Sequence, residues 1–183
     1  GDKYHTFVAR RFDRTEAQKR IHFASAMTLL GFKDGDNATT GKGYLDIVDF
    51  IVRGCTDVRS NLEELFRRVA FNIGVGNSDD HFRNHGFLLT PKGWTLSPAY
   101  DMNPTLDETQ SLLLTQTTNE ANPQLLLDAC SEYMLDRKTA SGIMAEVGYA
   151  LSDWEKTARI LNIPGQEIEM FRWRFEKMLT LFK

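Results

Sequence analysis

The run G-N-S-D-D-H-F-R-N-H-G, residues 76 to 86, gathers acidic, amide, imidazole and guanidinium side chains in one polar stretch. Asn84 lies five positions after Asp79, and Asp101 follows beyond a segment with the pattern of a β-hairpin. Protein kinases use this order of parts: an aspartate that accepts the proton of the substrate hydroxyl, an asparagine that binds Mg²⁺, and a second metal-binding aspartate. The spacing predicts phosphoryl transfer, with Asp79 as the base and Asn84 and Asp101 as metal ligands.

The order has a geometric reason. A base and a metal ligand on one tight loop are held close together, so that hydroxyl, γ-phosphate and metal can meet in line. Oxygen ligands suit Mg²⁺, which keeps its other positions for water and phosphate oxygens. Taken singly, each of the three residues is more often a cap or turn residue. Their order, with a helix before them and Pro98 and Pro104 around Asp101, favours the catalytic interpretation.

A second interpretation uses the histidines. His81 and His85 are spaced i, i+4, which on a helix would direct both imidazoles to one Zn²⁺, with Asp79 or Asp80 as a third ligand. That arrangement would make a metal-dependent phosphohydrolase. Against it, the glycines before the run and the strand expected at Gly86 leave little room for the helical turn that the spacing requires.

The remaining polar residues of the run receive simpler interpretations. Asp80 does not keep the five-residue offset to Asn84, so we expect it to be a solvent-facing turn residue. His85 is expected to be structural. Arg83 could hold a phosphate or pair with a loop carboxylate, and the sequence leaves both open.

Helical patterns precede the run. We expect a short extended segment at 6–10, a helix over 16–30 closed by Gly31 as a left-handed cap, and a helix over 44–52. The capping box S-N-L-E at Ser60 predicts the start of a strong helix that delivers the chain to Gly76. Its apolar stripe is Leu62, Leu65, Phe66, Val69 and Ile73.

A hairpin and further helices follow the run. G-F-L-L-T and W-T-L-S flank P-K-G, a hairpin signature, and residues 111–115 suggest one more strand. From about residue 123 the pattern is helical, with one apolar stripe from Ile143 to Leu161 and a second from Ile168 to Phe182. Two packed antiparallel helices are expected there.

Composition excludes some classes of protein. The 183 residues, 42% hydrophobic and 26% charged, indicate one globular domain. A net charge of -3 argues against a domain that grips nucleic acid directly. No apolar run is long enough to span a membrane and no secretory signal is evident, so a cytoplasmic location without membrane contact is expected. Two distant cysteines indicate free thiols in a reducing compartment.

Residues 76–89, followed by W-T-L-S-P-A-Y-D-M-N-P, resemble the C-terminal part of the HipA-like family, the serine/threonine kinase toxins of bacterial toxin-antitoxin pairs. F-V-A-R-R-F-D-R, R-I-H-F-A-S-A-M and Y-L-D-I-V-D-F-I are also similar to the family's sequence. The resemblance covers essentially the whole chain. It implies a mainly α fold, a protein-kinase-like C-terminal lobe with a small β-hairpin at the active cleft.

The resemblance also implies roles for single residues. The family's base falls on Asp79 and its Mg²⁺ ligands on Asn84 and Asp101. ATP is the implied cosubstrate. The residues expected at the nucleotide are His81, which follows the base by two positions, Tyr100 beside the metal aspartate, and Arg10 and Phe12 in the family's hinge between lobes.

The chain departs from the family in one respect. No G-x-G-x-x-G and no P-loop occur in it, although kinases of this family cover the phosphates with a loop of an N-terminal lobe. We therefore expect residues 1–14 to be the end of an N-lobe strand and the hinge, and 15–183 to be the helical lobe of a longer protein. Alone, such a piece is expected to be inactive.

Partners are implied by the resemblance only. The expected substrate is a protein, with an aminoacyl-tRNA synthetase as the example from the family, and the expected restraint is a HipB-like helix-turn-helix antitoxin. DNA would then be contacted only through the antitoxin. The competing interpretation is a pseudokinase or an antitoxin-binding module without catalysis.

Overall fold

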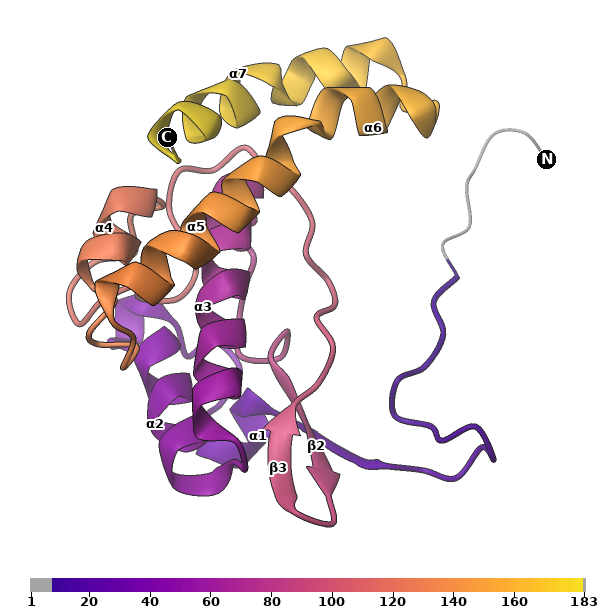
Figure 1. Ribbon diagram of the computed structural model, residues 1–183, viewed down its shortest axis with the longest axis vertical. Helices are drawn as coiled ribbons and strands as arrows, with labels where there is room; N and C mark the ends of the chain where they lie inside the picture. The colour runs from indigo at the N-terminus through magenta and orange to yellow at the C-terminus, as the bar shows by residue number, and fades with distance from the viewer. Residues whose placement is uncertain (1–7, 183) are drawn as a thin grey trace.

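The computed structural model describes residues 8–182 and is mainly helical, with one small sheet (Figure 1). The longer helices are α2 (Tyr44–Gly54), α3 (Val58–Val75), α5 (Arg137–Ser152) and α7 (Gly165–Leu181). The short ones are α1 (Ala26–Leu30), η1 (Ala38–Thr40, a 3-10 helix), α4 (Pro123–Asp128) and α6 (Trp154–Ile160). The strands are β1 (His22–Ser25), β2 (Gly86–Thr90) and β3 (Gly93–Leu96).

Helix α3 is the centre of the core. It packs against α2, α4, α5 and α7, and the ribbon shows α5 crossing it on one side (Figure 1). The predicted apolar stripe is confirmed, because every member of it is buried. The polar loop therefore follows a helix that is held on several sides, and Asn72 and the cap residue Gly76 belong to the end of that helix.

The start of α3 differs from the prediction. The helix begins at Val58 rather than at Ser60, and its N-cap Asp57 has a left-handed backbone (φ 49°) with no side-chain cap bond. Asn61 Nδ2 donates to the Thr56 and Asp57 carbonyls at 2.7 and 3.0 Å, so it does not take over the backbone N–H groups that a capping box would satisfy. An amide inside the first turn thus satisfies the carbonyls at the helix entry.

The sheet contains a strand that the sequence patterns missed. The hairpin of β2 and β3 is confirmed, with Phe87 opposite Leu96, but β1 pairs antiparallel with β2 on its other edge, with Phe23 opposite Leu88. The helix predicted over 16–30 is therefore wrong for its first part and reduced to α1. Pairing with β2 satisfies the backbone of β1, and the Ser25 hydroxyl caps α1. The left-handed cap at Gly31 is confirmed (φ 70°).

Two other strand predictions are not realised. Residues 111–115 form no strand, only an isolated bridge between Gly43 and Leu113, although Leu112 and Leu114 are both buried. Of the extended segment predicted at 6–10, Thr6 and Phe7 lie outside the described residues, and residues 8–10 have no regular structure.

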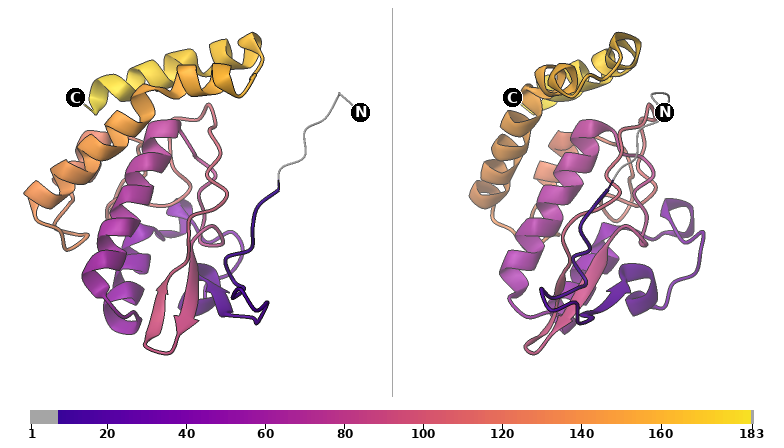
Figure 2. Two further views of the ribbon diagram at one scale, coloured as in Figure 1. Left: turned by 45° about the vertical axis from the view of Figure 1, so that its right-hand side comes forward. Right: turned by 90° about the vertical axis from the view of Figure 1, so that its right-hand side faces the viewer.

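The C-terminal helices form a layer over one end of α3 (Figure 2). The stripe predicted from Ile143 to Leu161 breaks, because α5 ends at Ser152 and α6 begins at Trp154, which leaves Leu161 66% exposed. Helices α6 and α7 run antiparallel, as Figures 1 and 2 show. Among residues 8–182, no helix combines the length and apolarity needed to cross a membrane.

Candidate active site

The polar run is a loop that joins α3 to β2. Gly76 ends α3 in a left-handed conformation (φ 73°), and a Cβ at this position would lie 2.5 Å from the Arg174 Nε of α7. Only glycine suits both requirements. The helix end and the C-terminal layer together fix where the loop starts.

Asp79 and Asn84 come together in this loop. Asp79 is exposed, whereas Asn84 is 7% exposed and donates from Nδ2 to the Asp79 carbonyl at 3.4 Å. That bond restricts the orientation of the amide. The amide's Oδ1, the oxygen that can bind a metal, therefore points away from the Asp79 carbonyl. A solvent-accessible carboxylate therefore lies beside an amide of restricted orientation.

Asp101 reaches the same loop through its neighbours. Tyr100 Oη donates to the Arg83 carbonyl at 2.6 Å, so the residues that precede Asp101 and Asn84 are bonded to each other. Asn77 Nδ2 also donates to the Asp101 carbonyl at 3.4 Å. Asp101 itself is exposed, with a left-handed backbone (φ 57°). The three predicted chemical residues are thus on two segments joined by hydrogen bonds.

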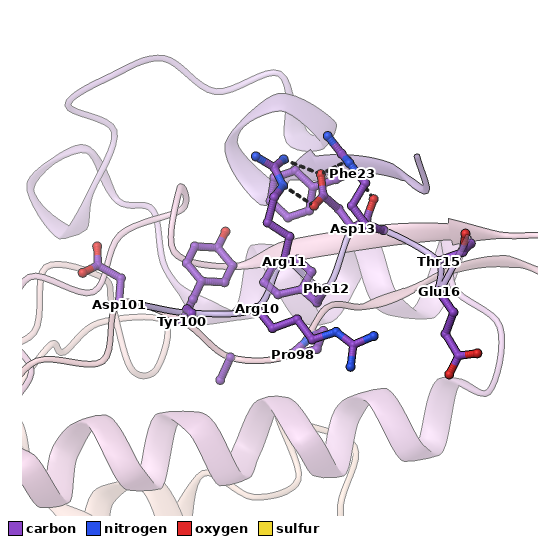
Figure 3. Close-up of a pocket in the computed structure, with 13 residues that line it drawn as sticks. Arg10, Arg11, Phe12, Asp13, Thr15, Glu16, Phe23, Pro98, Tyr100 and Asp101 are labelled. Atoms are coloured by element: carbon purple, nitrogen blue, oxygen red, sulfur yellow. Dashed lines mark hydrogen bonds and ion pairs between the residues drawn. The ribbon is translucent and has the colours of Figure 1, made fainter. Parts of the chain in front are cut away.

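A cavity of about 860 Å³ lies next to Asp101 (Figure 3). Three aromatic rings gather in it: Phe12 is 5.9 Å from Phe23 and 5.8 Å from Tyr100, measured between ring centroids. Burial raises the pKa of Tyr100 to about 12, so its hydroxyl stays a neutral donor. The other lining residues are Ala9–Arg11, Asp13–Glu16, Pro98, Ala99 and Asp101.

Phe23 is the cavity residue that sequence reasoning missed. It was assigned to a helix, and only the strand pairing of β1 directs its ring toward Phe12 and Tyr100. The signal that was available is the short alternation H-F-A-S before the Ser25 cap. Four residues are too few for a periodicity to separate strand from helix.

Charge at the mouth of the cavity is partly neutralised. Asp13 pairs with Arg11 at 2.6 Å and with Arg14 at 2.7 Å, and the Arg11 contact is drawn in Figure 3. Hydrogen bonds from Arg11, with smaller contributions from the Arg14 charge, lower the pKa of Asp13 to about 2. Arg10 lines the cavity and is exposed.

Asp80 corrects a prediction. It is not a solvent-facing turn residue but is 2% exposed, and its Oδ2 is hydrogen-bonded to Tyr44 Oη, Asn72 Nδ2 and His85 Nε2. The turn places its side chain toward α2 and α3, whereas its neighbour Asp79 is exposed. The structural role expected for His85 is confirmed by this buried bond.

The zinc arrangement is not formed. The loop has no helical turn at 81–85, and His85 is occupied by Asp80. Across residues 8–182 no group of three His, Cys, Asp or Glu side chains is placed to hold a metal ion. His81 is half-buried and does not line the cavity of Phe12 and Tyr100. Arg83 pairs with Asp34, which is one of the two roles left open by the sequence.

Comparison with known proteins decides the family. A family model described as the HipA-like C-terminal domain matches residues 1–154. The chain belongs to this family. A "Putative kinase" of Haemophilus influenzae is 30% identical over 105 residues, which are 54% of this chain and 31% of that protein. The "Serine/threonine-protein kinase toxin HipA" of Shewanella oneidensis is 28% identical over 117 residues, 55% of this chain and 27% of that protein.

A solved structure shares the fold. In the complex of Shewanella oneidensis HipA, HipB and operator DNA, one chain matches with a TM-score of 0.69 at 17% identity, over 92% of this chain and 46% of that one. The matched regions make up 31% and 27% of the two curated relatives, so the matches cover less than a third of the length of each.

Proposed function

We propose that the protein carrying this domain transfers the γ-phosphoryl group of ATP to a serine or threonine hydroxyl of another protein. The observation that carries the proposal is the pair of bonds that join the two polar segments, Tyr100 to Arg83 and Asn84 to Asp79. They link the segment of the candidate base and one candidate metal ligand to the segment that carries the other candidate ligand, Asp101. The names of the two curated relatives, both kinases, support it.

Asp79 is proposed as the base. Its carboxylate is exposed to an incoming hydroxyl, while its backbone carbonyl is held by Asn84. A carboxylate in this position accepts the hydroxyl proton as the oxygen attacks the phosphorus. The exposed carboxylate suits a proton acceptor that must meet a second protein.

Asn84 and Asp101 are proposed to hold Mg²⁺. Both offer oxygen atoms, and the Asn84 amide is oriented by its donation to Asp79, so the donor set fits a hard cation. Bound Mg²⁺ neutralises charge on the β- and γ-phosphates. The Asp101 carboxylate is restricted by its left-handed backbone and by the Asn103 amide, which donates to Asp101 Oδ1 at 2.8 Å.

The cavity is proposed as the nucleotide site. Phe12, Phe23 and Tyr100 offer flat apolar faces for a purine, and Arg10 lies on the segment whose backbone would meet the base edge. His81, within the loop, is proposed to approach the phosphates. In this proposal residues 1–14 are the strand end and hinge and 15–183 the kinase-like C-terminal lobe, with residues 1–7 outside the described part.

The proposed partners follow the solved relative. Its complex contains HipB and operator DNA, which supports a HipB-like helix-turn-helix antitoxin as the partner here, with DNA contacted through it. The role proposed for the intact protein is that of a cytoplasmic toxin. Its protein substrate, an aminoacyl-tRNA synthetase in the family example, is a proposal from the resemblance alone.

The test is Asp79→Asn in the full-length protein, which should lower phosphoryl transfer by about 10² to 10⁴, the usual effect of a positioned base. Transfer is measured with γ-labelled ATP. Asp49→Asn is the matched control, because Asp49 is an exposed aspartate on α2, away from the loop, and it should leave transfer unchanged. Full activity in Asp79→Asn would refute the base. Absence of transfer in the wild type, with antitoxin binding intact, would favour the non-catalytic module.

A further inference from the structure

A buried carboxylate lies directly behind the proposed base. Asp80 Oδ2 is hydrogen-bonded at 2.7 Å to Tyr44 Oη of α2, at 2.6 Å to Asn72 Nδ2 of α3 and at 2.8 Å to His85 Nε2. Asp80 and His85 are each 2% exposed. A carboxylate oxygen only accepts, so all three partners donate to it. We propose that Asp80 and His85 are positioning residues that hold the loop of Asp79 and Asn84 against the helical core.

The spacing of the buried pair matches that of the exposed pair. Asp80 and His85 are five positions apart, and each directly follows one of the two proposed chemical residues, Asp79 and Asn84. The hydrogen bond between Asp80 and His85 therefore holds the loop at two points, one next to Asp79 and one next to Asn84. A shift of either buried residue would move its chemical neighbour.

The same network reaches the third chemical residue. Asn72, which donates to Asp80, accepts through its Oδ1 from Asn77 Nδ2 at 3.1 Å. Asn77 Nδ2 also points to the Asp101 carbonyl at 3.4 Å. Hydrogen bonds thus run continuously from Asp80 to the backbone of Asp101, and one buried carboxylate is tied to all three proposed catalytic and metal-binding positions.

The surroundings of Asp80 supply rigidity as well as hydrogen bonds. The Tyr44 ring packs edge-on against the His85 ring, with 5.7 Å between centroids, and Tyr44 is fully buried. Burial and the Asp80 charge raise the pKa of Tyr44 well above its usual value, so its hydroxyl remains a donor. The loop is therefore anchored to α2 and α3 at a point where side chains have little freedom.

The role as positioning residues rests on the proposed function, but loop anchoring can be measured without it. In Asp80→Ala of the full-length protein, amide hydrogen exchange should accelerate in residues 77–85 by about 10- to 100-fold, the factor expected for losing hydrogen bonds to a charged group. The isosteric Asp80→Asn keeps acceptors for Tyr44 and Asn72 and should show a smaller effect. Should Asp80→Ala not fold, Asp80→Asn and His85→Phe carry the same measurement.

Asn61→Ala is the matched control. Asn61, like Asn72, is a buried amide of α3, but its Oδ1 accepts from the Leu96 backbone N–H of β3. Its loss should accelerate exchange in the hairpin and leave residues 77–85 unchanged. Unchanged exchange of 77–85 in folded Asp80 variants would overturn the anchoring.

A second measurement tests positioning toward the metal. Mn²⁺ binding in the presence of a non-hydrolysable ATP analogue, followed by water proton relaxation, should weaken by about 10- to 100-fold in Asp80→Ala, as expected when a residue behind a metal ligand is lost. A smaller folded fraction would lower the number of sites without changing their affinity. Unaltered Mn²⁺ affinity, with faster loop exchange, would reduce Asp80 to a structural residue. Accelerated exchange in Asp80→Ala, with no metal binding or phosphoryl transfer in the wild type, would refute the proposed function and leave the anchoring standing.

Discussion

Asp79 and Asp80 are chemically identical neighbours with opposite environments. Asp79 is exposed at the loop surface, whereas Asp80 is buried and accepts three hydrogen bonds. The offset to Asn84 identified the exposed residue as the candidate base. It carried no information about Asp80, because the donors that stabilise this buried carboxylate include Tyr44 of α2 and Asn72 of α3, which lie outside the loop.

Asp13 gives a prediction at the same scale. Arg11→Gln should raise the pKa of Asp13 from about 2 part of the way toward its ordinary value of 3.8, because Arg11 donates the hydrogen bonds that lower it most. The folded-state pKa lies below the ordinary value. The contact therefore stabilises the fold above pH 3.8, and its contribution is lost as the pH falls toward 2.

The pKa of Asp13 is measured by NMR of the side-chain carboxyl through its titration. Arg53→Gln, which removes a similarly exposed arginine that pairs with Asp49, is the control and should leave Asp13 unchanged. An Asp13 titration that is the same in Arg11→Gln as in the wild type would contradict the assigned cause.

At the scale of elements, β1 forms one wall of the cavity through Phe23. β1 pairs with β2 at Ser25 and Gly86, and Phe23 lies across Gly86 toward Phe12 and Tyr100. A side chain at Gly86 would meet the Phe23 ring and lie 2.9 Å from Ser97 Oγ. The absence of a side chain at one position of β2 thus permits the aromatic cluster.

Gly86→Ala should lower the free energy of unfolding by about 1–3 kcal/mol, the usual cost of overpacking, and should displace Phe23 from the cluster. Denaturant unfolding measures the first effect, and the affinity for an adenine nucleotide measures the second. Gly142→Ala is the control: at this exposed position of α5 an added Cβ meets nothing within 4 Å, so it should raise stability by about 0.5–1 kcal/mol. Equal stability of the two variants would exclude the close approach.

At the scale of the whole molecule, the layer of C-terminal helices supports the start of the loop. Helix α7 packs against α3, α4 and α5, and its Arg174 contacts the position of Gly76 where the loop begins. The Phe175 ring stacks on Trp154 of α6 with 4.4 Å between centroids. Residues beyond 154, where the family match ends, therefore still bear on the geometry of the site.

Phe175→Ala should lower the free energy of unfolding by about 3–5 kcal/mol, because a buried aromatic ring is lost and the stack with Trp154 is broken. Gln166→Ala, an exposed position of the same helix with no side-chain hydrogen bond in the described part of the chain, should change it by no more than about 0.5 kcal/mol. Thermal and denaturant unfolding of both variants provide the comparison. A Phe175→Ala protein as stable as the wild type would show that α7 is docked weakly.

Sequence by itself determined the features that depend on neighbouring residues. The apolar period of α3 predicted its buried face, the P-K-G turn predicted the hairpin, and the offset from Asp79 to Asn84 singled out two residues that prove to be in contact. These features follow from the backbone geometry of short segments, so a local pattern contains them.

Only the tertiary structure decided which way several side chains face. β1 is a strand because β2 offers it a free edge, and Asp80 is buried because Tyr44, Asn72 and His85 meet around it. Phe23 belongs to the cavity for the same reason as Tyr100, since segments about 75 positions apart fold together. These contacts join different elements of the chain, and the free energy of burial and hydrogen bonding that fixes them exists only once those elements have met.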